Sequence, residues 1–179
     1  EQGNQEEVGA TLNNLGASYY NMQQYDKAVG YYEQALEVTR ETNNLRDQSI
    51  TLNNIGNINF DFNRYTEAIE YYEKSLQIKT ELSFHEGVAS TLHNIGNSYF
   101  KLGQFNKALE YYLHSQEVAE ESNYREVIWR NFEAFAKTYA ALGNYKSAFD
   151  NYQLYANSRF EFDGQSMQLV ELREQYESS

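Results

Sequence analysis

Three short stretches of the chain combine side-chain amides with a glycine. They read TLNNLG at 11–16, TLNNIG at 51–56 and TLHNIG at 91–96, so a histidine replaces one amide in the third. An asparagine side chain offers two donors and two acceptors, and it can pair with both the N–H and the C=O of another backbone. Asn and Gly each weaken a helix interior, by about 0.7 and about 1 kcal/mol relative to Ala. Their recurrence therefore indicates a role beyond helix formation, and hydrogen bonding to a polypeptide is the chemistry that suits them.

The chain of 179 residues repeats with a period of 40. The motif begins at Thr11, Thr51 and Thr91, and the next step of the same length reaches Asn131 in NFEAFAKTYAALGNY. Within each unit, apolar and small residues recur at spacings of three and four, which are typical of amphipathic helices rather than strands. Polar breaks such as NMQQY at 21–25 and ETNN at 41–44 separate these segments. Each unit is therefore predicted to form a helix, a tight turn and a second helix.

The order of residues within a unit resembles the tetratricopeptide repeat. In the second unit the resemblance is carried by Leu52, Ile55 and Gly56, followed by Tyr65, Ala68 and Tyr72. The family pattern is usually about 34 residues long. Here the period is 40 and the chain has no proline, as in the longer repeats of polarity scaffolds, kinesin light chains and bacterial sensor or regulator proteins. The resemblance implies an all-α fold, a right-handed α-solenoid of stacked antiparallel helix pairs.

We expect a single repeat domain over residues 1–179, taken from a longer protein. Its four units are expected at about 5–44, 45–84, 85–124 and 125–160. The three-to-four spacing of Leu169, Leu172 and Tyr176, and of Met167 and Val170, predicts a further amphipathic helix at 165–177. Because a solenoid needs its terminal face covered, that helix is expected to cap the last unit or to act as a linker to another part of the longer protein.

The small residues are expected where the two helices of a unit cross. Without a side chain at Gly16, Gly56 and Gly96, two backbones could approach closely, and that contact would offset the lost helix propensity. The facing surface would then be the alanine series of the second helices, namely Ala28, Ala68, Ala108 and Ala148.

The resemblance also implies a concave groove lined by the first helix of each unit. The family's groove positions, carried onto this sequence, fall on amides, one imidazole and aromatic rings: Asn13, Asn14, Tyr20, Asn53, Asn54, Asn57, Phe60, His93, Asn94, Asn97 and Phe100. The amides would pair with a peptide backbone, and the rings would form pockets for its apolar side chains. A second interpretation applies to Asn14, Asn54 and Asn94, which would bond to neighbouring helices and only stiffen the stack.

Positive charge gathers at the C-terminal end of the expected groove. Lys101, Arg130 and Lys137 lie there, although the chain as a whole has a formal net charge of −12. A partner with an acidic group at that end would be favoured. The carboxylate clamp of chaperone-binding family members is not expected, because Asn13 and Ala17 replace its first elements.

Composition excludes several classes of function. A pI near 4.7 argues against non-specific binding to nucleic acid or to anionic lipid, so no membrane contact is expected. No apolar run approaches the roughly 18 residues that a membrane span needs. The chain has no cysteine, and the spacing of His85, His93 and His114 does not suit a metal site. We expect no metal, no cofactor and no catalytic activity, since no nucleophile and base can be assembled from the motifs.

The sequence thus predicts a protein- or peptide-binding scaffold, the sensory or adaptor region of a multi-domain signalling protein. The alternative is a structural module that forms homo-oligomers by stacking through its exposed end helices. The motifs do not identify the partner or the compartment. The cytoplasm is expected, or the periplasm if the segment is part of a bacterial membrane sensor.

Overall fold

The computed structural model describes residues 2–162, and within that range the chain forms eight α-helices and no strand. The helices are α1 (Gln2–Asn21), α2 (Tyr25–Glu41), α3 (Leu45–Asp61), α4 (Tyr65–Glu81), α5 (His85–Lys101), α6 (Phe105–Glu121), α7 (Arg125–Ala141) and α8 (Tyr145–Phe162). The predicted helix at 165–177 lies outside the described residues.

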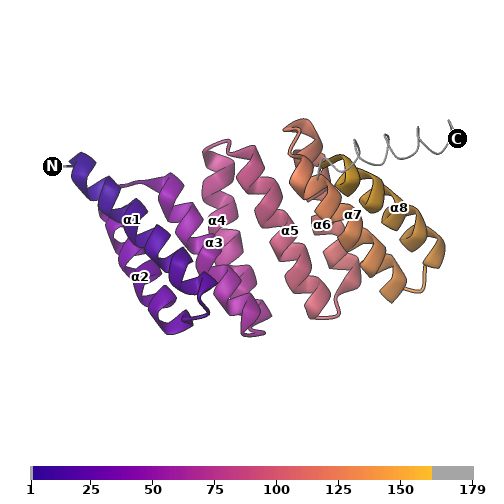
Figure 1. The fold of residues 1–179 in the computed structure, drawn as a ribbon, viewed down its shortest axis with the longest axis horizontal. Coiled ribbons are helices and arrows are strands. Elements are labelled where there is room, and N and C mark those ends of the chain that lie inside the picture. The colour runs from indigo at the N-terminus through magenta and orange to yellow at the C-terminus, as the bar shows by residue number, and fades with distance from the viewer. Residues whose placement is uncertain (1, 163–179) are drawn as a thin grey trace, which may run out of the picture.

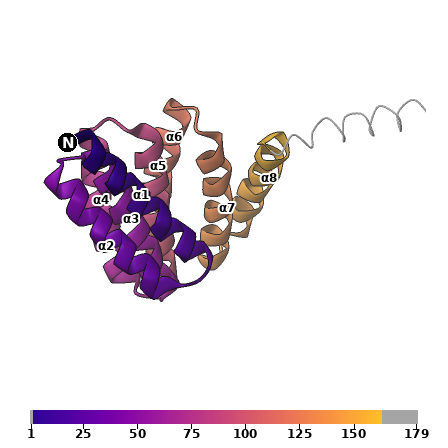
Figure 2. The same ribbon diagram turned by 60° about the vertical axis from the view of Figure 1, so that its left-hand side comes forward.

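Consecutive helices pair and the pairs stack along one long axis, with the N-terminus at one end of the array (Figure 1). Each helix packs on the next one, and α1 also contacts α3, as α5 contacts α7. Seen from the side, the array turns as it advances, so that α7 and α8 lie to one side of the earlier pairs (Figure 2). The predicted all-α solenoid is confirmed. No described helix is long and apolar enough to cross a membrane.

A single left-handed residue closes each turn between helices. These residues have φ between +52° and +77°, and they are Gln23, Asn43, Asn63, Ser83, Gly103, Asn123 and Gly143. The backbone amide of each donates to a carbonyl three residues earlier, as from Gly103 to Phe100 at 3.0 Å. Only Gly103 and Gly143 adopt this conformation without a steric penalty. The same turn therefore forms at each break between the described helices.

The repeated glycines make room for an aromatic ring, and not for a second backbone as the sequence led us to expect. A Cβ atom on Gly56 would lie 2.5 Å from Cε1 of Tyr72, and one on Gly96 would lie 2.6 Å from the ring of Tyr112. Gly16 stands in the same relation to Tyr32. The second helix of each of these units thus sends a tyrosine across the first helix at its glycine.

The alanine series is buried where the pattern predicted, in the first three units. Ala28, Ala68 and Ala108 are each 0% exposed, and each belongs to a hydrophobic cluster that includes the tyrosine of its own unit. Ala148 is half-buried.

We expect Gly56→Ala to lower the free energy of unfolding by about 1–3 kcal/mol, because the new methyl group overpacks the ring of Tyr72. That ring has little freedom to move, since its hydroxyl donates to Asn57 at 2.8 Å. Urea denaturation measures the effect. Gly30→Ala is the matched control, because a Cβ atom there meets nothing within 4 Å, and that variant should be neutral or slightly stabilised. Equal midpoints for Gly56→Ala and wild type would contradict the packing described.

Candidate functional site

Two hollows adjoin on the face formed by the first helices of the units. The larger, of about 340 Å³, is lined by Phe60, His93, Asn97, Phe100, Lys101, Tyr112, Arg130, Glu133, Ala134 and Lys137. The smaller, of about 180 Å³, is lined by Tyr20, Asn57, Phe60, Asp61, Tyr72, Asn94, Asn97 and Arg130. Phe60, Asn97 and Arg130 border both. The two hollows together form the groove, and they bring together ten of the fourteen predicted groove residues.

Asn57 and Asn97 have their orientation fixed from beneath the groove. The hydroxyl of Tyr72 donates to Oδ1 of Asn57 at 2.8 Å, and the hydroxyl of Tyr112 donates to Oδ1 of Asn97 at 2.7 Å. Burial raises the pKa of both phenols, so they stay protonated and keep donating. With each oxygen occupied, the Nδ2 groups are left without a partner among the described residues. The groove therefore presents two amide donors at equivalent places, one repeat apart.

Asn13, Asn53 and Asn54, earlier in the motif, form hydrogen bonds to neighbouring units. Asn54 Nδ2 donates to Asn13 Oδ1 at 3.2 Å, and Asn53 Oδ1 lies 3.2 Å from Thr91 Oγ1. These contacts join α1 to α3 and α3 to α5, which is the stiffening role that the sequence left open for Asn54. Neither Asn14 nor Asn94 uses its side chain in this way; Asn14 is exposed, and Asn94 lines the smaller hollow. A part for any of them in binding stays a prediction.

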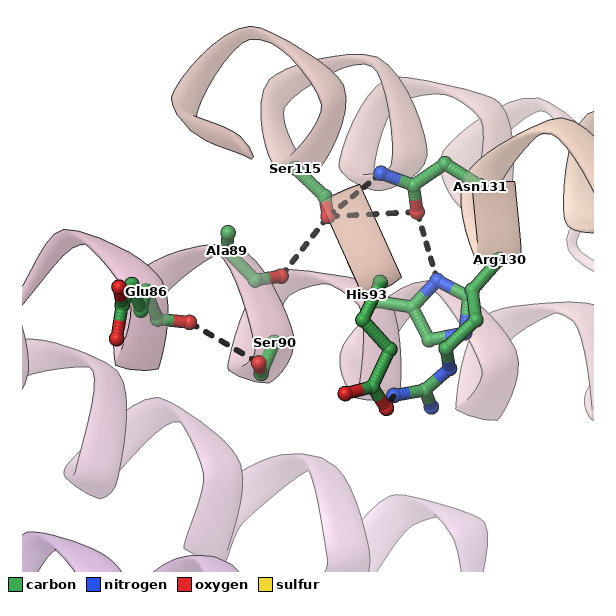
Figure 3. A network of polar contacts seen from close by, with 8 residues as sticks. Glu86, Ala89, Ser90, His93, Ser115, Arg130 and Asn131 are labelled. Carbon is green, nitrogen blue, oxygen red and sulfur yellow. Dashed lines mark hydrogen bonds and ion pairs between the residues drawn. The ribbon is translucent and has the colours of Figure 1, made fainter. Parts of the chain in front are cut away.

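His93 is buried, at 4% exposed, in a polar network between α5, α6 and α7 (Figure 3). Its Nδ1 lies 2.7 Å from Asn131 Oδ1, Asn131 Nδ2 donates to Ser115 Oγ at 2.9 Å, and Ser115 donates to the Ala89 carbonyl at 2.8 Å. Burial lowers the pKa of His93 to about 3, and the nearby charge of Arg130 adds to that shift. The imidazole is therefore neutral near pH 7.

Asn131 and Ser115 were not predicted from the sequence as partners of His93. The alignment of the repeats does contain a pattern that could have identified Asn131 as a partner of His93. At the place where the earlier units pair Asn13 with Thr51 and Asn53 with Thr91, the third interval has a histidine and an asparagine instead. Two departures at interacting positions of the same repeat indicate that they belong together.

The positive end of the groove is partly neutralised by glutamates of the same helix. Lys137 pairs with Glu133 at 2.6 Å, and Arg130 lies 3.9 Å from Glu126. Lys101 forms no ion pair within the described part of the chain. Positive charge still exceeds negative charge in the larger hollow, with three cations against Glu133. At the opposite end, the hydroxyl of Tyr20 donates to Asp61 at 2.6 Å.

Three aromatic side chains stand along the groove at equivalent positions. Tyr20, Phe60 and Phe100 are half-buried. Each packs on the ring that opens the second helix of its own unit, with centroid distances of 5.8, 5.3 and 5.3 Å to Tyr25, Tyr65 and Phe105. Edge and tilted contacts of this kind hold the rings in place. They form rigid walls against which an apolar group can pack.

The described residues contain no group of three or more His, Cys, Asp or Glu side chains that could hold a metal ion. His93 is bonded to an amide, and the groove carboxylates Asp61 and Glu133 are bonded to a phenol and an ammonium group. The arrangement is suited to hydrogen bonding, aromatic packing and charge pairing.

The sequence profile of the tetratricopeptide repeat family matches residues 7–81 and 87–157, which together make up most of the chain. No curated protein matches the sequence significantly.

Solved structures share the fold at low sequence identity. Aspartyl phosphate phosphatase F from Bacillus subtilis superposes with a TM-score of 0.84 and 20% identity, over 94% of this chain and 44% of that one. A Rap protein complexed with competence and sporulation factor superposes with a TM-score of 0.81 and 20% identity, over 88% of this chain and 44% of that one. BtubC (BKLC) from P. vanneervenii superposes with a TM-score of 0.78 and 20% identity, over 87% of this chain and 65% of that one. The chain thus spans less than two thirds of the length of each of these proteins.

Proposed function

The chain belongs to the tetratricopeptide repeat family, and we propose that it is a scaffold that binds an extended peptide in the groove. The observation that carries the proposal is the pair of unpartnered Nδ2 groups on Asn57 and Asn97, each held in place by a buried tyrosine. Two fixed donors one repeat apart suit the backbone carbonyls of a polypeptide, whatever its side chains.

The rest of the groove supplies selectivity. Phe60 and Phe100 offer walls for apolar side chains of the peptide. Lys101 and Arg130 favour an acidic residue or a terminal carboxylate at the C-terminal end of the array. The peptide is thereby given a direction, because the other end of the groove carries Asp61.

Structural similarity supports a role in signalling. One of the similar solved structures is a Rap protein in complex with competence and sporulation factor. By analogy, the present chain is the sensory or adaptor part of a larger signalling protein, and a non-catalytic one. The chain spans 44% of that protein's length, so the output of the whole protein is itself part of the proposal.

We expect the double substitution Asn57→Ala with Asn97→Ala to weaken peptide binding by about 5- to 150-fold. Each lost hydrogen bond removes roughly 0.5–1.5 kcal/mol. The measurement is calorimetry with peptides selected from a random display library on the wild-type chain. Asn157→Ala is the control, because Asn157 is exposed on α8 and outside both hollows. Unchanged affinity in the double variant, with its helical content intact, would contradict the groove assignment.

A second candidate function, self-association through an end helix, is favoured by the outer surface of α8. Tyr145 is 74% exposed, Phe149 60% and Tyr152 58%, which makes an apolar face that another copy could cover. Light scattering over a range of concentrations tests this candidate. A mass that stays monomeric at high concentration would remove it.

A further inference from the structure

We infer that the larger hollow receives a tyrosine side chain of the bound peptide, whose hydroxyl donates to Nε2 of His93 while a neighbouring carboxylate faces Lys101 and Arg130. This inference rests on the proposed function and goes beyond it by naming the anchor residue. It makes His93 a specificity-determining residue, whereas the sequence indicated only one polar groove position among several.

The hydrogen-bond network fixes which ring nitrogen of His93 carries the proton. The Ala89 carbonyl can only accept, so the single hydroxyl proton of Ser115 is used there, at 2.8 Å. Ser115 Oγ then accepts from Asn131 Nδ2 at 2.9 Å, which turns Asn131 Oδ1 toward the imidazole. An amide oxygen 2.7 Å from Nδ1 requires a proton on Nδ1. In the neutral ring, Nε2 is therefore a hydrogen-bond acceptor.

Nε2 is the part of His93 that remains open to a ligand. Nε2 has no hydrogen-bond partner among the described residues. The buried polar atoms without a partner in the described residues do not include Nε2, so this atom keeps some accessible surface. His93 itself lines the larger hollow, and Figure 3 shows its Nδ1 edge turned to Asn131. Burial and the charges of Arg130 and Lys137 lower its pKa, so Nε2 keeps its lone pair at pH 7.

The other groups of the hollow are walls or donors. Phe60, Phe100 and Ala134 are apolar, Asn97 offers its Nδ2, and the cations stand on α5 and α7. An occupant must therefore pack apolar area against the rings and still bring one donor to His93. A volume of about 340 Å³ is within the usual range for ligand pockets, and a tyrosine combines a ring with a donor at its far end. Phenylalanine would leave Nε2 without a hydrogen-bond donor. The acceptor oxygens of a phosphate group would be repelled by the lone pair of Nε2.

Nuclear magnetic resonance of the histidine side chains in the full chain tests the tautomer directly. Long-range ¹H–¹⁵N correlations are expected to show Nδ1 protonated and Nε2 unprotonated for His93, unchanged between pH 7 and pH 5. His93→Asn identifies the resonances by their disappearance. Protonation at Nε2, or titration of the ring near pH 6, would overturn the inference.

Matched peptides test the anchor. The probes are acetyl-Ala-Ala-Tyr and acetyl-Ala-Ala-Phe, each with a free terminal carboxylate, and the amidated form of the first. The tyrosine acid should shift the Nε2 resonance of His93 and bind about 3- to 10-fold more tightly than the phenylalanine acid, as one hydrogen bond predicts. The amidated peptide should bind more weakly than the acid. In His93→Asn the preference for tyrosine over phenylalanine should vanish.

The inference is overturned if the two acids bind wild type equally, or if the tyrosine acid leaves His93 unperturbed. Those results leave the proposed function standing whenever library peptides still bind and still depend on Asn57 and Asn97. Loss of that dependence would instead remove the proposed function. The comparison of the two acids on wild type needs no variant to fold, so it decides the question even if His93→Asn is unstable.

Discussion

Acidification from pH 7 to pH 5 is expected to lower the free energy of unfolding by about 2 kcal/mol through His93 alone. The pKa of this imidazole is about 3 in the folded chain, against 6.5 for an ordinary histidine. Between these two values the unfolded chain binds a proton that the folded chain excludes, so stability falls as the pH falls. Each pH unit below 6.5 costs about 1.4 kcal/mol. The loss begins near pH 6.5 and continues toward pH 3.

The pKa of His93 is lowered by burial of most of the ring and by neighbouring cations. Burial comes first, and Arg130 and Lys137 on α7 add unfavourable charge to a protonated imidazole. The bond to Asn131 acts in the opposite direction and is too weak to compensate. No carboxylate is in hydrogen-bonding contact with the ring in the described part of the chain. The protonated imidazole is therefore disfavoured in the folded chain.

Urea denaturation of wild type and of His93→Asn at pH 7 and pH 5 measures this effect. The two proteins are compared because carboxylates contribute to the pH dependence of each. His93→Asn, which places the residue of the two preceding units at this position, should lose about 2 kcal/mol less than wild type on acidification. His85→Asn and His114→Asn are controls, since both side chains are exposed. The same pH dependence in His93→Asn and wild type would show that His93 is not held neutral.

The sequence predicted the fold well because the fold is periodic. An error at one unit would have been visible against the other three, and the breaks near Gly103 and Gly143 repeat at the same register as those near Asn63. Local rules were sufficient for this part, because helix spacing and turn residues act over a few positions.

The packing role of Gly56 could not be predicted in the same way. Whether a bare position receives a backbone or a ring depends on which side chain crosses it, and Tyr72 lies 16 residues away. The consequence for the site is considerable, because the ring that fills this space also orients Asn57. The glycine of TLNNIG thus affects the groove through Tyr72 and Asn57, whereas the amides Asn53 and Asn54 bond to neighbouring units.

Lys79 is a further residue whose environment the sequence did not reveal. The equivalent places in the first and third units hold Thr39 and Ala119, and all three are buried. A lysine on a helix is ordinarily an exposed residue. Its burial follows from the stacking of α5 on α4, where a Cβ atom on Gly87 would lie only 3.0 Å from Cδ of the lysine. Only the tertiary arrangement reveals such a position.

We expect Lys79→Met to raise the free energy of unfolding by about 3 kcal/mol at pH 7. The lysine is 4% exposed, and burial lowers its pKa from 10.5 to about 8. Its ammonium group donates to Thr91 Oγ1 at 2.8 Å and forms no ion pair among the described residues. A shift of this size corresponds to about 3 kcal/mol of unfavourable burial. Methionine keeps the length of the side chain and removes the charge.

The pH dependence separates this effect from a simple change in packing. Below pH 8 the lysine is protonated in both states, so the penalty is fully present. Between pH 8 and pH 10 the folded chain gives up the proton while the unfolded chain keeps it, so wild type should gain stability as the pH rises. Lys79→Met should not show this gain, and Lys74→Met, at an exposed position on the same helix, should keep it.

The buried phenols of Tyr72 and Tyr112, with raised pKa values, oppose stability only above pH 10, and equally in all three proteins. Urea denaturation at pH 7, 8.5 and 9.5 decides the matter: a destabilised Lys79→Met that gains stability as wild type does would show that the ammonium group is solvated.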